Sequence, residues 1–248
     1  FMMYLDLNTF LFIVLAIFCG GLVKGTLGVG LPMISVPVIA FFLPPTKAIM
    51  LLCFPILCSN FLQMKVHKGI GSYRFAPMLF TLIIGLIIGG RLILEIELST
   101  VSIIIAISII AAAVVNLFGL NFRNIDIKYE RSFTLILGFF SGILGGLSTF
   151  FGPPILAYLI SIELEKEYFI RIISTIYFIG GFTLYSSLLY HGIGSLDDLY
   201  LSLFLVLPTL IAQNIGTKIR KHLSNEIFRN SILIILIIIG ISLLFKNI

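Results

Sequence analysis

The chain has 248 residues, of which 59% are hydrophobic and 11% are charged, whereas soluble domains average about 25% charged residues. This composition excludes a soluble globular protein. The net charge of +5 does not indicate nucleic-acid binding, because the basic residues lie in short gaps between apolar runs, as the positive-inside rule predicts. We therefore expect one membrane domain over residues 1–248, embedded in a lipid bilayer, with no nucleic-acid partner.

Gaps in the apolar pattern divide the chain into ten predicted helical segments. They cover residues 7–23, 31–43, 48–64, 75–94, 100–120, 132–147, 153–162, 168–190, 199–217 and 230–245. The segments at 31–43 and 153–162 are short for a crossing, which takes roughly 20 apolar residues. Each follows a glycine-rich stretch that ends in proline. This pattern predicts two broken-helix hairpins that return to their starting side; full crossings by the short segments are the alternative.

The second half of the chain repeats features of the first half. A spacing of 121 positions relates three pairs of residues: Gly21 and Gly142, Gly25 and Gly146, and Pro32 and Pro153. The sequence Gly-Ile-Gly-Ser also occurs twice, at 69–72 and 192–195. We therefore expect repeat 1 at 7–120 and repeat 2 at 132–245, each a broken-helix hairpin plus three transmembrane helices. Because each unit has an odd number of segments, the expected fold class is an all-α polytopic membrane protein with two inverted repeats.

The distribution of basic residues gives the orientation. Twelve of the 16 Lys and Arg residues fall in gaps that this threading places on one face: Lys65, Lys68, Arg74, Arg123, Lys128, Arg131, Lys166, Arg171, Lys218, Arg220, Lys221 and Arg229. By the positive-inside rule this face is cytoplasmic. Both termini are then expected to be extracytoplasmic.

The two glycine-rich breaks form the candidate binding site. Backbone that leaves a helix within hydrocarbon exposes unpaired N–H and C=O groups, so such breaks belong at a cavity. Each short helix then points its N-terminus, the positive end of its dipole, toward the middle of the membrane, where two opposed N-termini favour an anion. The backbone residues in this prediction are Gly25, Gly28, Gly30 and Pro32 in the first break, and Gly152 and Pro153 in the second. Simple helix packing is the alternative role for the glycines.

Lys24 is the one cation that the segments place at membrane depth, which makes it the first candidate for binding negative charge. A snorkelling or carbonyl-capped lysine is the structural alternative. The other polar candidates for substrate binding are Thr26, Asn60, Gln63, Ser148, Thr149 and Asn214. For the hydroxyls the alternative is capping of their own helices, and for the amides it is hydrogen bonding between helices.

All 11 carboxylates lie in gaps or near the ends of segments, as do the three histidines. The sequence therefore lacks the acidic residues at depth that a proton relay or a divalent-metal cage uses. It also has no HExxH motif and no paired intramembrane aspartates. We expect a protein that is not an enzyme, with no catalytic residues, no metal and no cofactor.

At the two breaks the sequence resembles the TauE/SafE family of sulfite exporters, also called the toluene-sulfonate uptake permease family. The resemblance rests on VKGTLGVGLPMISVPVIAFFLPPTKAI at 23–49 and on GILGGLSTFFGPPILAYLI at 142–160. It also includes the Asn-x-x-Gln pattern at Asn60 and Gln63, whereas Thr149 and Phe150 depart from the family pattern. The resemblance implies a transporter of small sulfur-containing anions, in some relatives of carboxylates, in a bacterial or archaeal inner membrane.

We expect a secondary transporter that exports a small anion, sulfite or another sulfur-containing oxyanion or organosulfonate, by alternating access at a midplane site. Export is favoured because a negative-inside potential drives an anion outward by about 2.3 kcal/mol per charge per 100 mV. The alternatives are an anion-selective channel, an uptake permease for sulfur-containing or carboxylate anions, and a membrane enzyme or receptor that binds such a compound without moving it. The sequence leaves the oligomeric state open.

Overall fold

The computed structural model describes residues 6–40, 42–66, 73–92, 127–148, 151–228 and a few positions between 230 and 238. Within these residues every regular element is a helix, so the all-α class is confirmed. The elements are α1 Leu7–Leu27, α2 Leu31–Ile39, α3 Pro45–Met50, α4 Cys53–Val66, the 3-10 helix η1 Tyr73–Phe75, α5 Ala76–Leu92, α7 Ile127–Ser148, α8 Gly152–Ser161, α9 Lys166–Tyr190, α10 Leu196–Phe204 and α11 Val206–Arg220. The predicted segment 100–120, most of 230–245 and the repeated sequence at 69–72 lie outside the described residues.

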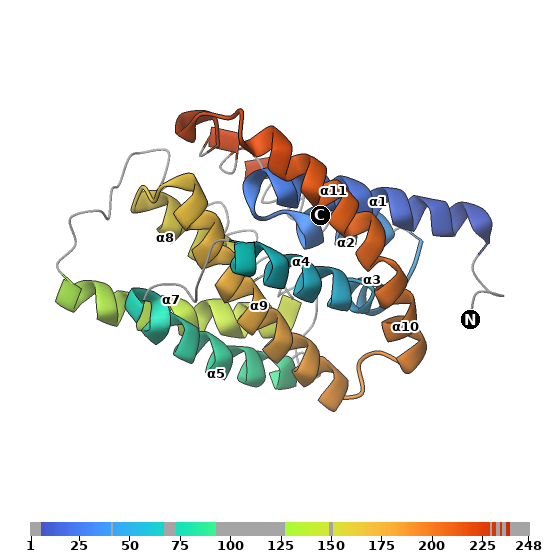
Figure 1. Cartoon of the computed structure of the whole chain (residues 1–248). Helices are drawn as coiled ribbons and strands as arrows, with labels where there is room; N and C mark the ends of the chain where they lie inside the picture. Colours follow the sequence, from blue (N-terminus) through green and yellow to red (C-terminus); the bar gives the residue numbers. More distant parts are fainter. Residues whose placement is uncertain are drawn as a thin grey trace.

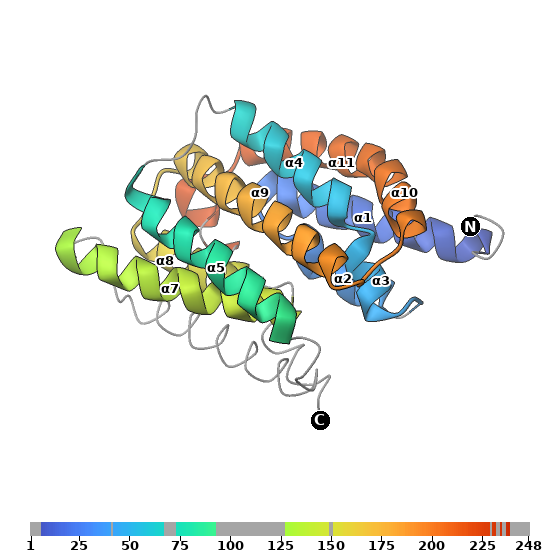
Figure 2. The same ribbon diagram turned by 90° about the horizontal axis from the view of Figure 1, so that it is seen from below.

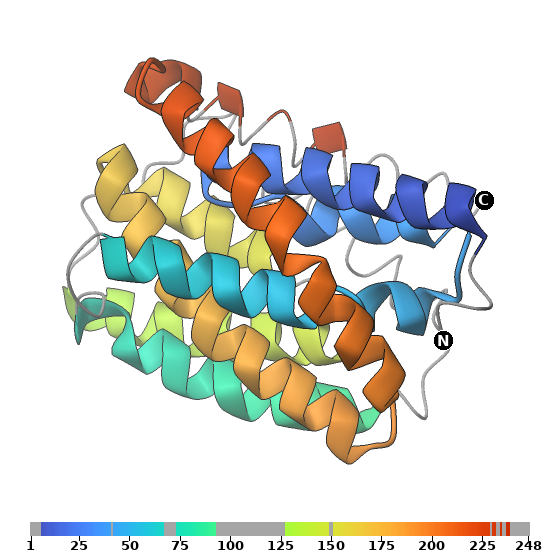
Figure 3. The same cartoon turned by 45° about the vertical axis from the view of Figure 1, so that its right-hand side comes forward.

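Five segments in the described part of the chain are long and apolar enough to cross a membrane. They are Leu7–Leu27, Thr46–Met64, Tyr73–Leu92, Lys166–Tyr190 and Leu196–Arg220. The two short helices are different, because the 9 residues of α2 and the 10 of α8 rise only about 14 and 15 Å at 1.5 Å per residue. In Figure 3, α2 turns back beside the second half of α1, so the two helices form a hairpin.

Two predicted segments are interrupted by proline. The segment expected at 48–64 is divided into α3 and α4, and the segment expected at 199–217 is divided into α10 and α11. Pro55 and Pro208 each lie at the third position of the second helix of the pair. Proline is tolerated in the first turn of a helix, but further along it removes a hydrogen bond and clashes with the carbonyl four residues before it. Each helix therefore has to restart just before its proline.

The helices pack in pairs that join the two halves of the chain. α1 lies along α11, α5 lies along α7, and α4 and α9 meet in the centre (Figures 1 and 2). Followed by colour in Figure 2, α1 and α11 run one way and α5 and α7 run the opposite way. The two outer pairs thus have opposite directions across the same central pair.

Glycines allow the two helices of each outer pair to pack closely against each other. A Cβ added to Gly25 would overlap the backbone of Gln213 on α11, and one added to Gly216 would lie 2.9 Å from the Cα of Gly25. In the other pair, a Cβ on Gly89 would overlap the backbone of Ile143, and one on Gly146 would overlap that of Gly90. Small residues let helix backbones approach in this way within a membrane. Gly25 and Gly146 therefore belong to helices and serve contacts, which was the alternative considered for the glycines.

The ends of the described helices fall on two sides of the molecule. Figure 2 shows the start of α1, the α2 to α3 turn, the end of α5 and the α9 to α10 turn on one side. The end of α4 and the start of α5, the start of α7, the α8 to α9 turn and the end of α11 lie on the other side. Both returning hairpins and full crossings by the two short segments would give this arrangement.

Candidate functional site

A small pocket with a volume of about 30 Å³ lies between the two breaks. Gly30 and Pro32 from the first break and Gly152 and Pro153 from the second all line it. The remaining walls come from α1, α4, α9 and the residues around α2 and α3, and they are mostly apolar. A mostly apolar lining with a few polar groups is typical of pockets for small molecules. The structure thus brings together two stretches that lie more than 100 residues apart in the sequence.

Lys24 supplies the only formal charge among the residues that line this pocket. Its side chain is buried, with 1% of its surface exposed, and its Nζ donates hydrogen bonds of 2.6 Å to the Oδ1 of Asn60 and 3.2 Å to the carbonyl of Gly28. Asn60 is held in place because its Nδ2 donates to the carbonyl of Ile56 at 2.8 Å. Lys24 is therefore capped by a carbonyl, as the structural alternative proposed, and it also faces the pocket.

The first break has a backbone that only glycine adopts readily. Gly28 and Gly30 have φ angles of 80° and 116°, in the left-handed region that disfavours other residues. The N–H of Gly28 donates to the carbonyl of Lys24 at 2.7 Å and ends α1. Pro32 then lies in the first turn of α2, where its missing N–H costs nothing.

The second break is closed by an aromatic side chain from α9. The phenol of Tyr177 lies so close to Gly152 that a Cβ there would overlap the hydroxyl. The ring of Phe151 also meets the Tyr177 ring edge-on, with centroids 5.2 Å apart. The Lys24 Nζ is 5.9 Å from the centroid of the same tyrosine ring, within the range of a cation–π contact. Tyr177 therefore touches both breaks.

The other predicted site residues have different outcomes. Gln63 lies behind Lys24, where its Nε2 donates to the Lys24 carbonyl at 3.4 Å and its Oε1 accepts from the Ser174 hydroxyl at 3.0 Å. The Thr26 hydroxyl donates to the Leu22 carbonyl of its own helix. Asn214 is exposed and does not line the pocket. Thr149 and the side chain of Ser148 lie outside the described residues.

Sequence reasoning did not assign four residues that the structure places at or near the site: Tyr177, Tyr185, Gln213 and Arg220. The two tyrosines line the pocket with Gly181, and their spacing of four residues puts all three on one helix face. That spacing was the available signal, but the partner of the face was not visible in the sequence. Gln213 is buried beside the exposed Asn214, the member of this amide pair that the sequence analysis predicted to bind substrate.

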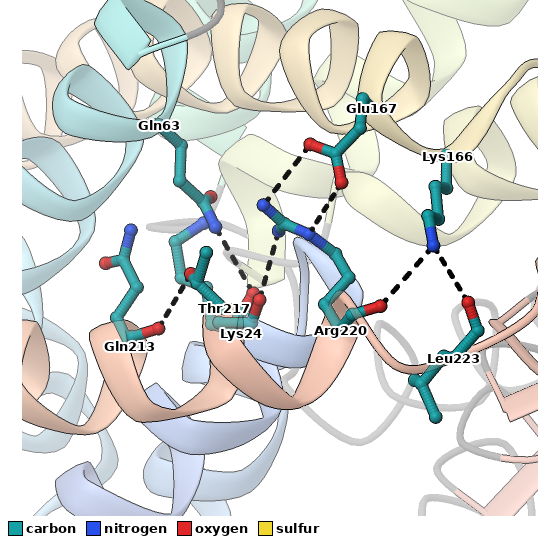
Figure 4. A network of polar contacts seen from close by, with 9 residues as sticks. Lys24, Gln63, Lys166, Glu167, Gln213, Thr217, Arg220 and Leu223 are labelled. Carbon is teal, nitrogen blue, oxygen red and sulfur yellow. Dashed lines mark hydrogen bonds and ion pairs between the residues drawn. The ribbon is translucent and has the colours of Figure 1, made fainter.

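A polar network closes the end of the molecule where α9 begins (Figure 4). Arg220 has 2% of its surface exposed; its Nη1 donates to the carbonyl of Gly25 at 3.0 Å, and its Nε lies 3.2 Å from the Glu167 carboxylate. Gln213 donates through Nε2 to the carbonyl of Ser59 at 3.1 Å. The pocket lies further along α9, from Tyr177 to Tyr185. The network and the pocket thus lie at different levels along α9.

The two breaks differ in charge. At the spacing of 121 positions, the residue that corresponds to Lys24 is Gly145. A Cβ at Gly145 would overlap the Cβ of Phe151, so this position has no room for a side chain in the described structure. The cation belongs to one half of the chain only.

Comparison with known proteins identifies the family. The family model described as "Sulfite exporter TauE/SafE" matches residues 13–243, nearly the whole chain. No curated protein and no solved structure matched the chain. The family implies membrane embedding and transport of sulfite or related small anions, which agrees with the apolar helices and with a cation in the pocket. The chain belongs to the TauE/SafE sulfite exporter family.

Proposed function

We propose that this protein is a secondary transporter that exports sulfite or another small sulfur-containing anion, and that the anion binds between the two breaks beside Lys24. The observation that carries the proposal is a buried lysine that faces a pocket and forms no ion pair with any carboxylate among the described residues. A buried charge is costly unless an opposite charge accompanies it. An anion from solution would supply that charge.

The groups that bind the anion in this proposal come from both halves of the chain. Lys24 contributes its charge and its remaining N–H, since two of its three N–H groups have partners among the described residues. The N–H groups of Leu31 and Met33 in the first turn of α2 have no backbone acceptor there and add donors at the first break. Tyr177 adds a hydroxyl at the second break. Asn60 and Gln63 hold the lysine and its backbone in position.

We infer that the two halves are inverted repeats. A two-fold exchange of the halves would replace α1 by α7 and α11 by α5, so the pair α1 and α11 would become the pair α7 and α5. Both pairs occur, and they run in opposite directions (Figure 2). The matched glycines support the same exchange, since Gly25 packs on α11 as Gly146 packs on α5. The same exchange would replace α4 by α9 and α9 by α4, so their central contact would be retained.

The contacts that join the two halves support alternating access. Three hydrogen bonds near the start of α9 cross from one repeat to the other: Gln63 with Ser174, Gln213 with the Ser59 carbonyl, and Arg220 with the Gly25 carbonyl. The pocket lies on the opposite side of Lys24 from these bonds. We propose that the bonds form a cytoplasmic gate, and that they break when the pocket opens inward. In this proposal the conformation described here is closed to the cytoplasm.

The membrane and the direction of transport follow from charge. The side with the gate contains most of the basic gaps, so we assign it to the cytoplasm of an inner membrane and both termini to the outside. The membrane potential then favours movement of an anion outward. Uptake would need a coupled ion, and no carboxylate lines the pocket to bind one.

Flux in proteoliposomes tests the proposal. Vesicles loaded with sulfite should lose it in a saturable manner when a valinomycin-clamped potential is negative on the side that contains sulfite. Lys24→Ala should abolish this flux, whereas Lys218→Ala, which removes an exposed lysine of α11, should leave it unchanged. Single-channel currents would show a channel instead, and flux that requires an inward proton or sodium gradient would show an uptake permease. Equal flux in both variants would contradict the site.

A further inference from the structure

We propose that the pocket selects anions with a single negative charge, so that sulfite is bound as hydrogen sulfite, HSO₃⁻, and not as the dianion SO₃²⁻. This inference rests on the proposed function and specifies the charge state of its substrate. It follows from a count of the charges around the pocket, from the partial charges of the helix ends, and from the nature of the walls.

The formal charge available to an anion is +1. Lys24 is the only Lys, Arg, Asp or Glu among the residues that line the pocket. A second buried cation, Arg220, lies on the gate side, where its guanidinium is paired with Glu167 at 3.2 Å and bonded to the Gly25 carbonyl. This cation is therefore engaged in the gate and does not line the pocket. One full positive charge remains.

The helix ends do not add a second positive charge. A helix N-terminus is equivalent to about +0.5 of a charge and a C-terminus to about −0.5. At the first break the start of α2 lies next to the end of α1, and the Gly28 carbonyl at that end is within 3.2 Å of the Lys24 Nζ. α8 likewise starts next to the end of α7. Each break thus contains ends of both signs, whose contributions approximately cancel. Three prolines also reduce the number of N–H donors at the tips: Pro32, Pro153 and Pro154.

The walls offer few groups that could solvate a second negative charge. Besides Lys24, Asn60 and the hydroxyls of Tyr177 and Tyr185, of which the latter donates to the Ile49 carbonyl, the pocket is enclosed mainly by apolar side chains, among them Met33, Val36, Ile56 and Leu184. The Asn60 Oδ1 already accepts a hydrogen bond from Lys24, and its Nδ2 already donates one to the Ile56 carbonyl. A monoanion beside Lys24 forms a neutral pair. A dianion leaves one net charge in an apolar environment, where an unpaired ion costs several kcal/mol.

Methanesulfonate and sulfate test this inference, because the two ions have nearly the same size and shape and differ by one charge. Their affinities for the purified protein are measured by calorimetry and by thermal stabilisation at neutral pH. We expect methanesulfonate to bind at least tenfold more tightly than sulfate. Sulfite provides a second measurement: its apparent affinity should fall as rising pH converts HSO₃⁻ to SO₃²⁻, while the affinity for methanesulfonate, measured in parallel, corrects for titration of the protein.

Two variants make the test specific. Lys24→Arg retains one charge and should retain the preference for methanesulfonate. Ile56→Lys adds a second cation one helical turn from Asn60 and should shift the preference toward sulfate. Sulfate binding as tightly as methanesulfonate in the unmodified protein would overturn the inference and leave the proposed function intact. Binding of neither methanesulfonate nor sulfite would contradict the proposed function itself.

Discussion

Lys24 on α1 and Asn60 on α4 are joined by a hydrogen bond of 2.6 Å from the lysine Nζ to the asparagine Oδ1. The contact holds an ammonium group against a neutral oxygen, in a place where an ion pair would be expected for a side chain with 1% exposure. The lysine is thus positioned by the protein and remains without a counter-charge from any described residue. This combination is what an exchangeable anion requires.

Asn60→Asp should stabilise the protein and weaken anion binding. The substitution keeps the size of the side chain and replaces the neutral oxygen by a carboxylate that pairs with Lys24 permanently. We expect a higher melting temperature in detergent and a loss of anion-dependent stabilisation, measured by differential scanning fluorimetry with and without sulfite. The matched control is Asn225→Asp, at an exposed position beyond the end of α11, which should change neither. Anion binding as strong as in the unmodified protein would show that Lys24 is not the counter-charge.

Gly152→Ala should destabilise the protein through Tyr177. A methyl group at this position would overlap the phenol hydroxyl, and overpacking of this kind costs about 1–3 kcal/mol. Adding Tyr177→Phe removes the overlapping oxygen and should restore part of the lost stability. Gly181→Ala is the control, because its added Cβ would meet the nearest atom at 3.4 Å, an ordinary contact. The test is a double-mutant cycle of melting temperatures. Additive effects of the two substitutions would show that Tyr177 does not interact with Gly152.

Arg220→Leu should favour opening toward the cytoplasm. It removes the bond that joins α11 to the Gly25 carbonyl across the two halves. The readout is a reporter cysteine at Ser59, whose side chain is fully buried, in a background where Cys19, Cys53 and Cys58 are replaced by alanine. We expect faster maleimide labelling of this cysteine from the cytoplasmic side of inverted vesicles. Lys218→Leu, an exposed control on the same helix, should leave the rate unchanged, and an unchanged rate in Arg220→Leu would remove Arg220 from the gate.

Single cysteines at the helix ends test the orientation. Tyr73 begins η1, just before α5, and Tyr190 ends α9; they are 96% and 88% exposed. The start of α5 and the end of α9 lie on opposite sides of the molecule in Figure 2. In the same cysteine-free background, an impermeant maleimide should label Tyr190→Cys in intact cells and Tyr73→Cys only after permeabilisation. The reverse pattern would invert the assignment of the cytoplasmic side.

The breaks and the central lysine could be predicted because their signals are local. Gly28, Gly30 and Pro32 act through their own backbone angles, so their effect can be inferred without a partner. Lys24 stands out because a cation inside an apolar run is costly wherever it lies. Asn60 and Gln63 were also candidates from the sequence; they are three residues apart, which puts them on one helix face, and both hydrogen-bond to Lys24.

The remainder of the site depends on which helices meet. In the sequence, nothing distinguishes Tyr177 from the other aromatic residues. Its role depends on the packing of α9 against Gly152. The choice between Gln213 and Asn214 depends on the rotation of α11, which is set by its contact with Gly25. Arg220 was assigned to a solvated gap, yet folding buries it against Glu167 and α1. Glu130 is likewise buried, beside Arg74 and Tyr158, although it lies near a helix end.

Lys24 in the first half corresponds to Gly145, which has no charge, in the second half. This difference affects how the membrane voltage acts on the carrier. If the halves exchange roles during transport, the Lys24 ammonium group moves with the first half. The second half has no equivalent charge at Gly145 to balance this movement. A carrier loaded with a monoanion then crosses as a neutral complex, whereas the unloaded carrier returns with a net positive charge. Voltage would therefore act on the return step, and an interior-negative cell would accelerate the resetting of the carrier rather than the passage of its cargo.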